Sequence, residues 1–156
     1  FLCENLPRNR FKLPVGARLN VYMNEYFVIR SYYRYYFDDW GITSHTASLE
    51  LPIKISDKFT IAPLYRYYMQ TESDYFAPKE VHLSTEKYYT SDYDLSAFSA
   101  NQYGMALRYT DIFTKAKIWK FSLKNMELRY NHYQRSNNLN AYIITLGVKL
   151  FFQDLI

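Results

Sequence analysis

The sequence predicts an all-β protein: a transmembrane antiparallel β-barrel, of which these 156 residues form about seven C-terminal strands of a larger barrel. Three observations predict it. Apolar and polar residues alternate along most of the chain, which is the period of a strand and not of a helix. Connections alternate between short turns and long polar loops, as in outer-membrane barrels. Finally, 18 tyrosines raise the aromatic share to 20%, and many fall at similar positions along the strands.

The alternation is clearest in residues 11–23, where every second residue is apolar from Phe11 to Met23. The same period predicts further strands over residues 26–38, 46–55, 59–70, 102–109, 126–131 and 142–152. Residues 27–37 and 59–69 are near copies, which indicates a hairpin as the repeated unit. The alternation shifts phase at Asn125, so a longer turn or a bulged extension is expected just before it.

We expect a single barrel fragment over residues 1–156. Extracellular loops are expected near 1–9, 39–44, 71–101 and 136–138, and periplasmic turns near 24–25, 56–58 and 110–124. A complete barrel with both termini in the periplasm has an even number of strands, so seven strands imply further strands upstream. Three prolines inside strand patterns, Pro14, Pro52 and Pro63, count against a closed sheet because each removes a ladder donor.

One face of the predicted strands carries the apolar residues and most of the clustered tyrosines. In strands that run toward the long loops, these tyrosines fall at one height, as expected for an aromatic girdle at a membrane interface. The residues predicted to contact the lipid interface are Tyr33, Tyr35, Tyr65, Tyr67 and Tyr130. Strand propensity also favours tyrosine, but it does not predict a common height.

The other face carries most of the charge. The residues expected to line the lumen are Arg18, Arg30, Arg34, Glu50, Arg66, Arg108, Glu127 and Arg129. An arginine-rich lumen favours anionic or polar solutes. A closed interior in which the charges pair with one another is an equally open alternative. A soluble sandwich would also alternate, with this face simply in water.

The last predicted strand contains a further motif. Thr145, Gly147, Leu150 and Phe152 resemble the β-signal by which the barrel assembly machinery recognises the final strand of a substrate, although residues 153–156 extend beyond the usual aromatic terminus. This assigns the chain two partners, the assembly machinery and outer-membrane lipids. No apolar run approaches the roughly 18 residues of a membrane helix.

No enzymatic activity, cofactor or metal is predicted. The single cysteine, Cys3, cannot form an internal disulfide. His45, His82 and His132 lack metal-ligand spacing, and Ser44 and Ser84 near two of them form only a weak hydrolase hypothesis. A surface calcium site in the acidic loop is left open; its acids are Asp74, Glu80, Glu86, Asp92 and Asp94. Nucleic acid is not expected, because the arginines are spread singly over the strands.

Four segments carry a resemblance to a known family: residues 10–20, 32–56, 88–104 and 127–146. Together they resemble the C-terminal part of an uncharacterised, domain-of-unknown-function family of outer-membrane β-barrel proteins from Bacteroidota-type bacteria. The resemblance implies a bacterial outer-membrane location and a barrel fold, and it implies no activity. The function expected is passage of small polar or anionic solutes. The alternative is a non-conducting barrel subunit or scaffold of a larger outer-membrane complex, which docks a lipoprotein or another partner through its surface loops.

Overall fold

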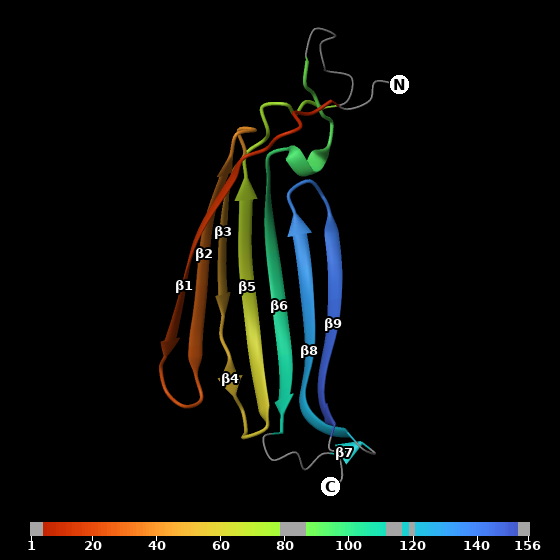
Figure 1. The fold of residues 1–156 in the computed structure, drawn as a ribbon. Helices are drawn as coiled ribbons and strands as arrows, with labels where there is room; N and C mark the ends of the chain where they lie inside the picture. Colours follow the sequence, from red (N-terminus) through yellow and green to blue (C-terminus); the bar gives the residue numbers. More distant parts are fainter. Residues whose placement is uncertain (1–4, 79–86, 112–116, 119–120, 153–156) are drawn as a thin grey trace.

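A computed structural model describes residues 5–78, 87–111, 117–118 and 121–152 (Figure 1). It confirms the all-β prediction. The long strands are β1 (Lys12–Tyr22), β2 (Val28–Asp38), β3 (Thr43–Glu50), β5 (Phe59–Gln70), β6 (Phe98–Thr110), β8 (Phe121–Arg135) and β9 (Asn140–Phe152). Two short strands, β4 (Ile53–Lys54) and β7 (Lys117–Ile118), and a 3-10 turn, η1 (Tyr93–Leu95), complete the elements. No helix in the described part of the chain has the length and hydropathy needed to cross a membrane.

Each long strand pairs antiparallel with the next long strand along the chain, which gives a single meandering sheet. The short strands extend it, because β4 pairs with β5 and β7 pairs with the start of β8. Strands β1 and β9 are the two outer strands. In the described part of the chain they do not pair with each other, so the sheet is open (Figure 1).

The connections differ in kind at the two ends of the sheet. The β1–β2 and β4–β5 links are tight turns at one end, called here the turn end. The β2–β3, β5–β6 and β8–β9 links lie at the opposite end, the loop end, together with the described N-terminal residues (Figure 1). Strand β8 already begins at Phe121, inside the segment expected as a turn over 110–124. Its register with β9 shifts between Leu123 and Asn125, which confirms the phase shift seen in the sequence.

The prolines interrupt the sheet less than expected, because each lies where no described strand needs its donor. Pro14 lies in the outer strand β1. Pro52 separates β3 from β4, and its carbonyl still accepts a bond from the Val28 N–H at 3.1 Å. Pro63 faces this interruption: its carbonyl accepts from the Leu51 N–H at 3.0 Å, so its missing N–H points toward the end of β3. The predicted strand over 46–55 is therefore two strands.

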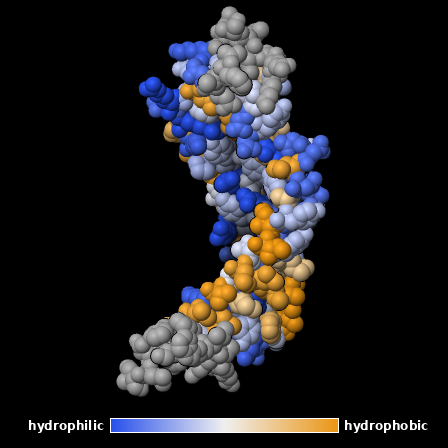
Figure 2. All heavy atoms as spheres, turned by 90° about the vertical axis from the view of Figure 1, so that its right-hand side faces the viewer, coloured by the Kyte–Doolittle hydropathy of each residue, from blue (hydrophilic) through white to orange (hydrophobic). Residues whose placement is uncertain are grey.

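The sheet has almost no apolar core. Among the described residues, the buried apolar side chains are Trp40, Ile42, Ala62, Ala100 and Ala106, whereas large apolar residues are exposed along every long strand. Leu49, Ile53, Leu146 and Leu150 are 41%, 37%, 64% and 46% exposed, so no second layer of described residues covers this face. Figure 2, seen from the β9 side, shows a bowed molecule with hydrophobic residues gathered toward the turn end and hydrophilic residues toward the loop end.

Candidate functional site: the arginine-rich face of the sheet

The strand pairing sorts the side chains into two faces, as the alternation predicts. The apolar residues of neighbouring strands lie opposite one another. For example, Leu107 lies opposite Ile61 on one side and opposite Leu128 on the other. The charged residues lie opposite one another on the other face, which we call the polar face. Two of its pairing rows cross the whole sheet. One contains Arg18, Tyr32, Ser48, Arg66, Gln102 and Tyr133, and the next toward the turn end contains Asn20, Arg30, Glu50, Leu64, Gly104 and Asn131.

At the turn end, three arginines of the polar face are held by two glutamates. The Arg108 Nε donates to Glu127 Oε2 at 2.8 Å, and the Arg129 Nη2 donates to Glu127 Oε1 at 3.0 Å. The Arg129 Nη2 also lies 3.5 Å from Glu50 Oε1. Arg30 Nη1 lies 3.6 Å from Glu50 Oε2. We call these five residues the turn-end network.

Small residues let this network cross the sheet. Arg129 is on β8 and Glu50 on β3, with β5 and β6 between them. In the row of Arg129, those two strands contribute Ala62 and Ala106, each 2% exposed. Alanines on an open flat sheet would be exposed; these are covered because long charged side chains converge over them. The polar face is therefore the face on which side chains crowd together.

Nearer the middle of the polar face, the arginines have no such partners. Arg18, Arg34 and Arg66 make no ion pair or hydrogen bond with a described residue through their side chains. Arg18 lies over the Tyr32 ring at 5.6 Å, and the Nε of Arg34 is buried without a partner. The directly opposite Thr46 is fully buried, and its hydroxyl is also unpartnered. This half of the face therefore presents uncompensated positive charge.

A third cluster closes the loop end of β2. The buried Asp38 carboxylate accepts bonds from Arg10 Nε at 2.9 Å, from the Tyr36 hydroxyl at 2.7 Å and from the N–H groups of Trp40 and Ile42. Burial alone would raise the pKa of Asp38, but the hydrogen bonds from Tyr36, Arg10 and Ile42 outweigh it and lower that pKa below its usual value. The Arg10 guanidinium also lies 4.4 Å from the centre of the Trp40 ring.

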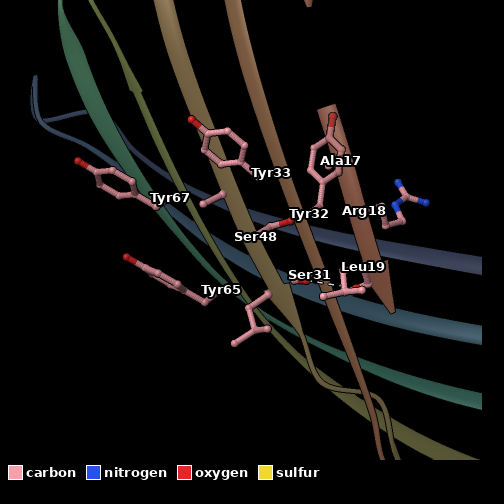
Figure 3. A pocket seen from close by; sticks show the side chains of 11 residues that line it. Ala17, Arg18, Leu19, Ser31, Tyr32, Tyr33, Ser48, Tyr65 and Tyr67 are labelled. Atoms are coloured by element: carbon pink, nitrogen blue, oxygen red, sulfur yellow. Dashed lines mark hydrogen bonds between the residues drawn. The ribbon is translucent and has the colours of Figure 1, made fainter. Parts of the chain in front are cut away.

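The opposite face carries the predicted interface tyrosines. The rings of Tyr33, Tyr65 and Tyr67 point to one side of the sheet, and Arg18 points to the other (Figure 3). Between the tyrosines lies an apolar groove of about 610 Å³, whose floor includes Ala47 and Leu49. The Tyr65 hydroxyl donates to Asn101 Oδ1 at 2.8 Å, and the Tyr33 hydroxyl lies 2.6 Å from His45 Nδ1. Their place at a membrane interface stays a prediction, as it does for Tyr35 and Tyr130.

Two further tyrosines, which were not among the predicted interface residues, belong to this set. Tyr103 lies opposite Tyr65, with 5.3 Å between ring centroids, and Tyr142 stacks on His132 at 4.6 Å. Both alternate in phase with the apolar face, so the signal was present. Their strands run away from the long loops, and the predicted common height concerned only strands that run toward these loops.

The remaining candidate residues are dispersed. Thr145 and Gly147 of the predicted assembly signal lie on the polar face of β9, opposite Arg129 and Glu127, and Leu150 lies on the apolar face. Glu80, His82, Ser84 and Glu86 lie outside the described residues, as does Cys3. In the part of the chain that the structure describes, no three His, Cys, Asp or Glu side chains gather as metal ligands would.

Comparison with known families gives one match. A family model described as "Protein of unknown function (DUF3570)" matches residues 1–150. The chain belongs to this family. No curated protein and no solved structure matches the chain. Membership of the DUF3570 family agrees with the resemblance to an uncharacterised domain family, and the family description itself names no activity, membrane or partner.

Proposed function

We propose that this DUF3570 chain forms part of a β-barrel in the bacterial outer membrane, whose polar face lines a path for small polar and anionic solutes. The observation that carries the proposal is the uncovered apolar face of a one-layer sheet, opposite a face rich in arginine. Soluble monomers rarely expose a continuous apolar surface of more than a few hundred Å². A lipid bilayer would cover this face without a second protein layer.

The tyrosines support a tilted arrangement in a membrane. Tyr130 on β8 belongs to the pairing row that reaches β2 at Ile29, but the first tyrosine of this face on β2 is Tyr33, four residues nearer the loop end. At about 3.4 Å per residue and 4.8 Å between strands, the offset from Tyr130 to Tyr33 over four strand spacings is a slope of about 35°. Tyr142 on β9 does not continue this slope, because it lies two residues nearer the loop end than the partner of Tyr130. Strands of outer-membrane barrels tilt by roughly 35–45°. A belt at constant height in a bilayer would cross the rows at this angle.

The two outer strands support a larger closed structure. In hydrocarbon, every backbone N–H and C=O must be hydrogen-bonded within the protein, so a spanning sheet has no free edge. The outer sides of β1 and β9 are unpaired among the described residues. Additional strands between β1 and β9 would satisfy these groups and enclose the polar face. In this arrangement the last strand carries the proposed assembly signal, which consists of Thr145, Gly147, Leu150 and Phe152.

The charge of the enclosed face favours anions. Seven arginines stand there; Arg135 is paired with Asp94, and Glu50 and Glu127 are occupied by the turn-end network. The uncompensated charge is that of Arg18, Arg34 and Arg66 in the middle of the face. Charges that line a narrow aqueous path with low-dielectric walls select solutes of the opposite sign.

Single-channel recording of the full-length protein in planar bilayers tests this function. We expect a conductance that prefers anions in a KCl gradient, and a weakened or reversed preference when Arg34→Glu and Arg66→Glu are combined. The matched control is Arg8→Glu with Lys87→Glu, which makes the same charge change at two exposed loop-end residues. Unchanged selectivity in the first pair would remove Arg34 and Arg66 from the path. Absence of the protein from the outer-membrane fraction would contradict the location.

A second candidate function is a non-conducting scaffold, and the loop end favours it. The end of the insert before β6 is held to the sheet: Gln70 Nε2 donates to the carbonyls of Asp94 and Ser96 at 2.9 and 2.7 Å, and Arg135 Nη1 donates to Asp94 Oδ1 at 2.6 Å. This leaves Tyr93 half exposed at the surface. If the protein is a scaffold, a docked lipoprotein or other envelope protein should copurify with the full-length protein. The full-length protein should then show no channel conductance at high salt.

A further inference from the structure

A small hollow opens on the polar face between β5, β6 and β8. Its volume is about 200 Å³, room for several water molecules, and its lining consists of Arg66, Tyr68, Ala100, Gln102 and Tyr133. Pairing holds these residues together, because Arg66 lies directly opposite Gln102, and Gln102 directly opposite Tyr133. Ala100, 1% exposed, has no side chain beyond its Cβ and leaves the space open.

The lining offers donors and no acid. The guanidinium of Arg66 has five N–H donors and cannot accept, and Gln102 and Tyr133 add an amide NH₂ and a hydroxyl. None of these three side chains has a hydrogen-bond or ion-pair partner among the described residues. The Tyr68 hydroxyl is engaged, since it donates to Gln70 Oε1 at 2.6 Å.

Acids beyond this lining are paired with other arginines. Arg135 lies opposite Ala100, and its guanidinium binds Asp94 at 2.6 Å while lying over the Phe98 ring. The glutamates of the turn-end network are held by Arg30, Arg108 and Arg129. Arg66 therefore differs from the arginines of the turn-end network, because its N–H donors are free. The same hollow also contains the amide of Gln102 and the hydroxyl of Tyr133.

We propose that this hollow binds an oxyanion, a carboxylate or a phosphate group, through Arg66, Gln102 and Tyr133. The planar fork of a guanidinium matches two oxygens of either group at once, and an amide and a hydroxyl satisfy the remaining oxygens. Binding requires only this lining. That the hollow would act as a binding site along the path of a solute rests on the proposed function.

Calorimetry on the full-length protein in detergent micelles tests the site, with inorganic phosphate and acetate titrated separately in low-chloride buffer. We expect saturable binding of at least one of them, weakened about tenfold or more by Arg66→Gln, because a charge-assisted bidentate contact is lost. Tyr133→Phe, which keeps the ring, should weaken binding by a smaller factor. Circular dichroism of each variant checks that the sheet is intact.

The matched control is Lys54→Gln, which removes one positive charge from the turn end, where Lys54 pairs with Asp57 at 3.1 Å. Binding should be unchanged in this variant. Wild-type protein that binds neither anion, or Arg66→Gln and Tyr133→Phe proteins that bind as the wild type does, would overturn the proposal. The two titrations separate a phosphate from a carboxylate ligand. Binding that depends on Arg66 in a protein without conductance would contradict the proposed function and leave the site standing.

Discussion

The turn-end network and the middle of the polar face use the same residue type in opposite ways. Arg108 and Arg129 bind one carboxylate, that of Glu127, and their side chains are about a quarter exposed. Arg34 and Arg66, on neighbouring rows, face hydroxyls and an amide instead. An arginine with its carboxylate partner stabilises the sheet. An arginine without one costs stability or contributes little, and it stays available to an anion from solution.

The largest effect on stability is expected at the carboxylate that holds two arginines. Glu127→Gln should lower the free energy of unfolding by about 2 kcal/mol, because two part-buried guanidinium groups lose their counter-charge. Urea unfolding in lipid vesicles, followed by tryptophan fluorescence, measures it. The control is Glu25→Gln at an exposed turn residue, which should change little. Equal effects of the two substitutions would show that the network contributes nothing.

A smaller effect is expected from acid at the loop end, because one carboxylate is involved. The pKa of Asp38 is lowered by folding, so its stabilising contribution is complete above the unfolded value near 4 and is lost as the pH falls through the lower folded value. The urea midpoint should therefore fall on going from pH 5 to pH 2.5. Asp38→Asn should flatten this part of the pH profile. A profile unchanged by that substitution would place the acid sensitivity at other carboxylates.

The smallest effect is expected in the middle of the face. Arg34→Gln should change the free energy of unfolding by no more than about 0.5 kcal/mol, since no described partner loses a bond. The same urea titration measures it beside Glu127→Gln. A loss as large as that of Glu127→Gln would mean that Arg34 stabilises the sheet, and the contrast between the two regions would fail.

Local periodicity was enough to predict the seven long strands and both faces. The alternation around Leu19, Ile61 and Leu146 places each of these residues on the apolar face, and the phase shift at Asn125 locates the irregular register. Both signals depend only on neighbours along the chain, which is why one sequence carries them.

The pairing of the charges was not predictable in the same way. Arg129 reaches Glu50 across two strands, which requires the register of four strands and the small size of Ala62 and Ala106 at once. The division of the arginines into paired and unpaired sets follows from such contacts. The Asp38 cluster also depends on residues far apart in sequence, because Arg10 reaches Asp38 across 28 residues.

The oblique line of tyrosines sets the size of the wall. In the proposed barrel, a strand inclined by about 35° would occupy about 6 Å of the perimeter, so the seven long strands would account for roughly 40 Å. A ring completed by a similar number of strands would measure about 80 Å around and about 26 Å across between backbones. At that diameter, the Arg66 side chain would not reach the far wall of the proposed barrel, and water would fill the space between.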